Sequence, residues 1–151
     1  MIILRIAGGI RQHFGMRVTE WIMTAALFGW SAVLAADPST FSSARSFTVI
    51  ASYGSEATWA NICLFAGLLR LGALTVNGTF RQFRFSPHLR AGASIASCVF
   101  WGQIALGVLM AWLTVGGAGG DGVIAYSTFM AIEMWNLFRA WADVGAGHRR
   151  H

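Results

Sequence analysis

Four long apolar runs, separated by short polar segments, constrain this chain more than any other feature. The runs cover residues 18–36, 57–77, 91–115 and 123–141. Each is close to the roughly 20 residues that an α-helix needs to cross a hydrocarbon core of ~30 Å. A backbone in lipid must satisfy its own hydrogen bonds, and runs of this length do so as helices. The sequence therefore predicts an all-α integral membrane bundle of four transmembrane helices.

The composition argues against an ordinary soluble domain. Of the 151 residues, 56% are hydrophobic and only 11% are charged, whereas soluble domains carry about 25% charged residues. The length suits one domain, so we expect residues 1–151 to form a single membrane domain. The net charge of +5 would suggest nucleic acid in a soluble protein. Because most arginines lie beside apolar runs, we expect the partner to be the lipid bilayer and not nucleic acid.

The N-terminal segment allows two interpretations. Residues 1–17 carry isoleucines at helical spacing together with arginines, a pattern that predicts a short amphipathic helix in the membrane interface. The first apolar run ends in VLAA at residues 33–36, which also resembles a signal-peptide cleavage site. Cleavage there would leave three spans with the N-terminus outside the cell, and this alternative stays open.

Arginines collect on alternate connecting segments. The N-terminal segment, the second loop and the C-terminal tail hold several each, whereas the first loop holds only Arg45 and the glycine-rich turn at 116–122 holds none. Arginine-rich segments stay in the cytoplasm, so we expect both termini of a four-span protein inside, in the bacterial inner membrane. The second loop is expected to contact lipid headgroups through its arginines, Arg81, Arg84 and Arg90.

Polar residues within the apolar runs form the candidate site. Arg70 lies 13 residues after Ala57 and Glu133 lies 10 residues after Val123. Both runs are expected to point from outside to inside, so the two depths differ by only ~5 Å and an ion pair is expected. A polar layer near the bilayer midplane is predicted from Arg70, Gln103, Glu133 and Asn136. Structural glue between helices and a path for ions or protons both remain open as its use.

The sequence carries no strong motif for catalysis, metal binding or nucleotide binding. Its histidines all lie outside the apolar runs, which argues against a membrane haem site. The two cysteines, Cys63 and Cys98, lie inside runs and are expected to be small buried hydrophobes without a disulfide. We therefore expect no enzymatic activity, no cofactor and no metal site.

A pattern across residues 57–143 resembles a known class of proteins. It consists of LRLGALTVNG, an arginine-rich loop with SPHLR, a tryptophan-containing run and EMWNLFRAWAD. Together these are similar to small multi-span membrane proteins of tailed phages and prophage-like elements, some of which are holins. The resemblance implies a pore former that accumulates in the inner membrane, assembles into homo-oligomers and permeabilises it. Four spans exceed the one to three common among holins, and the resemblance assigns no functional residue.

Two other functions remain open from the sequence. The first is an accessory or assembly subunit that docks its aromatic and small-residue faces against partner subunits of a larger membrane complex. The second is a small proton-coupled transporter in which Glu133 is the coupling acid.

Overall fold

The protein is all-helical in the parts that the structure describes. A computed structural model describes residues 15–79 and 85–148. Its four long helices are α2 (Val18–Ala36), α5 (Glu56–Thr79), α6 (Ser86–Thr114) and α7 (Asp121–His148). The short ones are η1 (Gly15–Arg17), α3 (Thr40–Ser43), η2 (Arg45–Phe47) and α4 (Thr48–Ala51). These described ranges contain no strand, so the predicted all-α class is confirmed.

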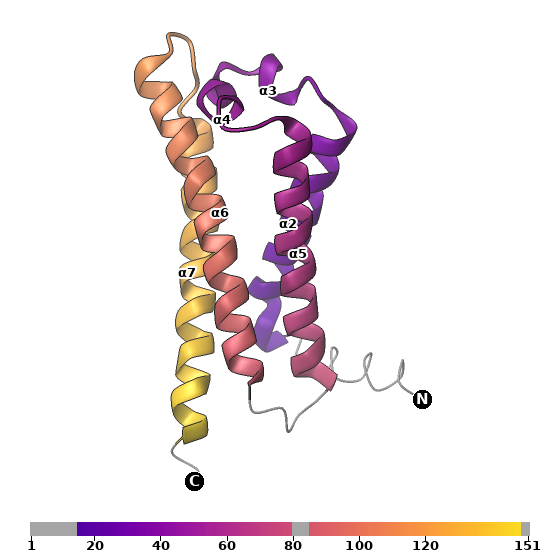
Figure 1. Ribbon diagram of the computed structural model, residues 1–151. Helices are drawn as coiled ribbons and strands as arrows, with labels where there is room; N and C mark the ends of the chain where they lie inside the picture. The colour runs from indigo at the N-terminus through magenta and orange to yellow at the C-terminus, as the bar shows by residue number, and fades with distance from the viewer. Residues whose placement is uncertain (1–14, 80–84, 149–151) are drawn as a thin grey trace.

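The four long helices run alternately up and down the molecule (Figure 1). α2 packs along α5, α6 packs along α7, and the ring closes through contacts of α5 with α6 and of α2 with α7. The two diagonal pairs, α2 with α6 and α5 with α7, therefore face each other across the axis. The start of α2, the end of α5, the start of α6 and the end of α7 share the lower end in Figure 1.

Proline and glycine mark several helix boundaries. α2 covers the same residues as the first predicted run and ends just before Pro38, whose ring cannot continue a helix. α6 begins with Ser86-Pro87, earlier than the run predicted at residue 91, because proline is accepted in the first helical turn. In the turn before α7, Gly117 has a φ angle of +80°, which glycine adopts without steric cost.

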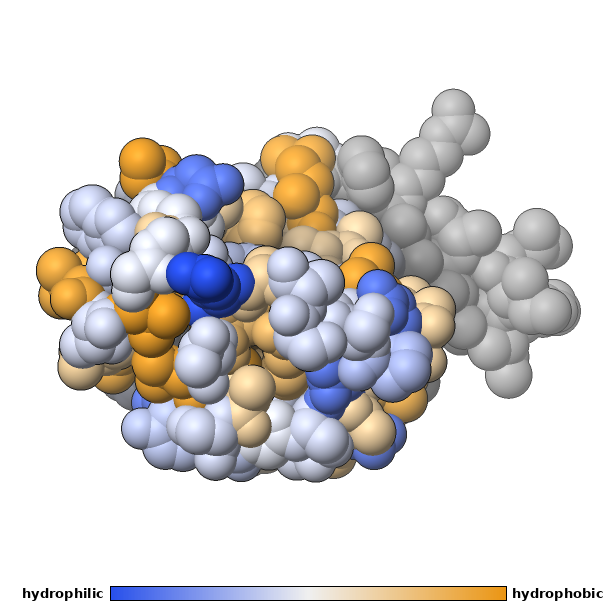
Figure 2. All heavy atoms as spheres, turned by 90° about the horizontal axis from the view of Figure 1, so that it is seen from above, coloured by the Kyte–Doolittle hydropathy of each residue, from blue (hydrophilic) through white to orange (hydrophobic). Residues whose placement is uncertain are grey.

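The segment between α2 and α5 caps the upper end of the bundle. We expected a plain loop there, and the structure shows the short helices α3, η2 and α4 (Figure 1). Ile50 of α4 is buried against Gly107 of α6, and Nη1 of Arg45 donates to the Gly116 carbonyl at 2.7 Å. Figure 2, which views this end, shows hydrophilic and weakly polar side chains between hydrophobic patches.

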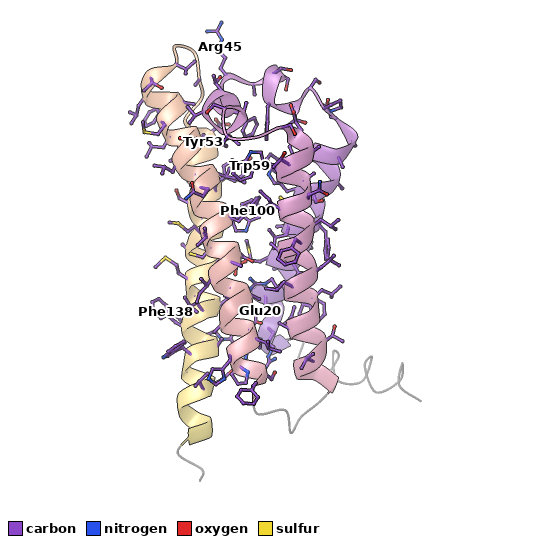
Figure 3. The ribbon with its side chains drawn as sticks, in the orientation of Figure 1. Glu20, Arg45, Tyr53, Trp59, Phe100 and Phe138 are labelled. Carbon is purple, nitrogen blue, oxygen red and sulfur yellow. The ribbon has the colours of Figure 1, made fainter. Side chains whose placement is uncertain are left out.

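The upper half of the bundle core is aromatic. Trp101 is almost fully buried and meets Phe129 and Phe100 edge-on, with ring centroids 4.8 and 5.0 Å away. Trp59 and Phe100 lie in this half in Figure 3. Rings from α2, the cap, α5 and α7 extend the cluster, namely Trp30, Phe41, Phe47, Trp59 and Tyr126. Such ring pairs add about 0.5–1.5 kcal/mol each beyond simple burial, so the cluster holds the cap onto the bundle.

Three of the described helices are long and apolar enough to cross a membrane. They are α2, α5 over Glu56–Val76, and α6. α7 is 28 residues long but less apolar, because Glu133, Asn136 and Arg139 lie within it. Many large hydrophobic side chains are exposed on the outside of the bundle, as in a membrane protein. The predicted interfacial helix at 1–17 lies outside the described residues except for η1.

Gly107 offers a test of how the cap is held. A Cβ atom at this position would lie 2.5 Å from Cγ1 of Ile50, which forces α4 or α6 to move. We expect Gly107→Ala to lower the free energy of unfolding in detergent, followed by circular dichroism, by about 1–3 kcal/mol. Gly29→Ala is the matched control, since a Cβ there meets nothing within 4 Å and alanine favours the helix. Equal stability of the two variants would contradict the packing of α4 on α6.

Candidate functional site

The lower half of the bundle core is polar and charged. Each long helix contributes one buried charged side chain to it: Glu20 from α2, Arg70 from α5, Arg90 from α6 and Glu133 from α7. We call these four residues the buried charge cluster. Glu20 lies below Trp59 and Phe100 in Figure 3. Two positive and two negative charges cancel, and buried charges are tolerated in proteins when they are paired.

Arg70 and Glu133 form an ion pair across the α5–α7 diagonal. Nη1 of Arg70 donates to Oε2 of Glu133, and the two side chains are 2% and 0% exposed. Nη1 also donates to Oγ of Ser97 at 3.3 Å, and Nε donates to the backbone carbonyl of Glu20 at 3.2 Å. The structure thus joins the two residues whose similar depths predicted an ion pair.

Asn136 extends this pair toward α2. It is fully buried one helical turn from Glu133 on α7, and its Nδ2 donates to Oε2 of Glu133 at 3.3 Å. Its Oδ1 accepts a hydrogen bond from Oγ1 of Thr19 at 2.6 Å. Arg70, Glu133 and Asn136 of the predicted polar layer therefore lie together.

Gln103 does not belong to the layer, although its position in the middle of the third apolar run predicted it there. Its side chain is exposed on the outside of α6, while Trp101 and Ile104 of the same helix are buried in the core. At about 100° per residue, Gln103 lies roughly a third of a turn away from the inward face. The prediction used depth along the helix alone, and the rotation of α6 about its own axis overturns it.

Arg90 and Glu20 form a second ion pair, on the α6–α2 diagonal. Nε of Arg90 donates to Oε2 of Glu20 at 3.0 Å, and Nη2 donates to Oε1 of the same carboxylate. This two-bond geometry is stronger and more directional than a single contact. The remaining Nη1 donates to Oδ2 of Asp143 at 2.6 Å, whose side chain is 53% exposed.

The expectation that Arg90 contacts lipid headgroups from a surface loop is wrong. α6 begins four residues before it, and its side chain is buried in the bundle. The other two arginines of that prediction, Arg81 and Arg84, lie outside the described residues. The sequence held one signal for the missed pair, because Glu20 and Arg90 carry opposite charges at the same-side ends of the first and third runs.

Arg17 lies at the lower edge of the cluster, just before α2. Burial lowers the pKa of its guanidinium, and the nearby charge of Arg90 lowers it further, while Glu20 and Asp143 raise it. The ordinary pKa of arginine is so far above neutrality that Arg17 stays charged. Arg17 and Arg90 therefore balance Glu20 and Asp143 at this end of the bundle.

The pairing limits the chemistry that the cluster can perform. Across residues 15–79 and 85–148, no group of three His, Cys, Asp or Glu side chains could hold a metal ion. Among the same residues, Oε1 of Glu133 and Nη2 of Arg70 are buried without a hydrogen-bond partner. These two atoms leave capacity for one more polar group beside the pair, which a proton path through Glu133 would need.

A double-mutant cycle tests the Arg70–Glu133 pair. Glu133→Gln leaves the Arg70 charge buried without its partner, and Arg70→Met does the same to Glu133. We expect each to lower the free energy of unfolding in detergent by about 3–5 kcal/mol, measured by circular dichroism. The double variant removes both charges, so its loss of unfolding free energy should be much smaller than the sum of the two single losses.

Arg45→Met is the matched control for this cycle. Arg45 is an exposed arginine of the cap, and its replacement should cost less than about 1 kcal/mol. Strictly additive losses in the Arg70–Glu133 cycle would show that the two side chains do not interact.

Comparisons of the chain with protein-family models, curated proteins and solved structures find no match.

Proposed function

We propose that all four long helices cross a lipid bilayer. Two of the residues that make α7 less apolar, Glu133 and Asn136, are buried and paired inside the bundle. Its exposed face is rich in large apolar side chains, including Phe138, which points away from the bundle in Figure 3: Ile124, Met134, Trp135, Phe138 and Trp141. Lipid would contact mainly that face. The mean hydropathy of the whole of α7 therefore understates how well the helix fits a membrane.

We further propose that the lower end of the bundle faces the cytoplasm of a bacterium. The arginine-rich N-terminal segment, second loop and C-terminal tail all join this end. At the capped end, Arg45 is the single arginine of the segments that connect the long helices. Positively charged segments beside a span remain on the cytoplasmic side. In this orientation the buried charge cluster lies in the cytoplasmic half of the bilayer.

Fusions at the C-terminus test the fourth span. If α7 crosses the membrane, green fluorescent protein attached after residue 151 should fluoresce and alkaline phosphatase attached there should be inactive. A second pair of fusions after Gly119, in the turn before α7, serves as the control and should give the opposite result. The same result at both positions would show that α7 does not cross.

Within the membrane, we propose that the protein acts without catalysis, as an accessory subunit of a larger membrane complex. The crossed ion pairs carry this proposal, because each charge of the cluster is neutralised within one chain. Such pairing favours one closed arrangement of the helices and leaves apolar outer faces for partner helices. A pore or carrier would instead need charged side chains that face a water-filled path.

A holin-like pore former is the second candidate, and one observation favours it. Gln103 presents its amide on the outside of α6, near the middle of the helix. Lateral assembly of many copies would bring such amides together inside the membrane. Polar side chains gathered in this way would seed a water-filled lesion.

Membrane potential distinguishes the two candidates. A voltage-sensitive dye is followed in bacteria after induced expression, with insertion confirmed by membrane fractionation. We expect a steady potential, because the charges of the closed bundle offer no path to ions. Sudden, timed depolarisation by the wild type would overturn the accessory-subunit proposal in favour of a pore. Loss of that depolarisation in Glu133→Gln, but not in Arg45→Met, would place Glu133 in the ion path if both variants insert into the membrane in the same amount as the wild type.

A further inference from the structure

The outer face of α6 carries a repeat that is typical of helix pairing. Its exposed side chains follow alternating steps of three and four residues: Ala96, Val99, Gln103, Leu106, Met110 and Leu113. We call these six residues the α6 seam. An average step of 3.5 residues keeps one stripe of a helix in contact with a parallel partner helix. The bundle itself uses the opposite face of α6, through residues such as Trp101, Ile104 and Val108.

Gln103 is the polar residue at the centre of the seam. Its side chain is exposed and has no hydrogen-bond partner among the described residues. In a bilayer, an amide that faces acyl chains loses its hydrogen bonds to water and gains none in return. Contact with lipid is therefore unfavourable for Gln103, and contact with another helix that offers a hydrogen-bonding group is more favourable.

The Gln103 amide and the absence of charged residues on this face suit contact with a second copy of the same chain. An amide carries both a donor and an acceptor, so two Gln103 side chains complement each other across a two-fold axis. Residues 91–120 contain no charged residue, so two copies meet along α6 without like charges in contact. Copies inserted in the same orientation hold their α6 helices parallel and at one depth, which places Gln103 opposite Gln103.

We propose that two copies of this chain associate through the α6 seam, with their Gln103 amides hydrogen-bonded to each other. Leu106 and Val99, on either side of Gln103, pack against the same residues of the second copy. A single polar residue among apolar seam positions sets the register of paired helices. The dimer leaves the outer faces of α2 and α5 free, so it is compatible with further partners and does not depend on the proposed accessory role.

Cysteine cross-linking of the full chain in native membranes tests the surface. Cys63→Ala and Cys98→Ala remove both native cysteines. In this background, Leu106→Cys and, independently, Val99→Cys should give a disulfide-linked dimer under mild oxidation. Phe65→Cys is the matched control on α5, where the native side chain is exposed as fully as Leu106, and it should cross-link little.

The contribution of the amide is measured separately. Energy transfer between donor- and acceptor-labelled chains in liposomes, at increasing lipid-to-protein ratio, gives the association constant. Gln103→Leu should weaken association about three- to thirtyfold, as expected for a hydrogen bond between membrane helices, and Gln103→Asn should restore part of it. Unfolding of the Gln103→Leu monomer in detergent should be unchanged, because the side chain is exposed in the single chain.

Three results would overturn the proposal. Equal cross-linking at residues 65 and 106 would show random collision in the membrane and no defined surface. Association that is unchanged by Gln103→Leu would show that the Gln103 amides do not pair between the two copies. If Val99→Cys and Leu106→Cys both fail to cross-link while the control variant inserts normally, the α6 seam is not the interface.

Discussion

The arrangement of the bundle depends on the requirement that a buried charge must meet an opposite charge. A charged side chain without a partner in a low-dielectric interior carries a desolvation penalty that few proteins could tolerate. Each long helix places one charge on the axis, and the two ion pairs span the two diagonals. Because Arg70 also donates to the carbonyl of Glu20, the pairs act as one unit. The rotation and depth of every helix must satisfy this unit.

The core divides into two halves with different physical roles. The lower half is held by directional hydrogen bonds and ion pairs, which specify one alignment of the helices. The upper half is held by contacts between aromatic rings, which tolerate small displacements and bind the cap by burial. Asp143 is half exposed at the lower end, whereas the rings and the cap cover the upper end. Water and protons would therefore approach the charges from the lower end.

The outer surface has the opposite character to this core. It carries large apolar side chains on every long helix, and exposed carboxamides lie among them, including Gln103 on α6 and Asn61 on α5. In a bilayer, association between helices comes from close packing and a few polar contacts, since lipid is as apolar as the helices are. A protein that pairs its buried charges within the core and exposes carboxamides among apolar side chains is suited to act through assembly with other helices.

The sequence alone determined the features that depend on position along the chain. Helix class, the bounds of α2 and the match in depth between Arg70 and Glu133 follow from hydropathy, length and the rise per residue. Only the tertiary structure decided which side of each helix faces the core. The rotation of α6 about its own axis places Gln103 on the outside and Arg90 beside Glu20 in the core. The cap also depends on the tertiary structure, because its short helices are stabilised by packing against α6. These features depend on neighbouring helices, and a hydropathy pattern contains no information about the direction in which a neighbour lies.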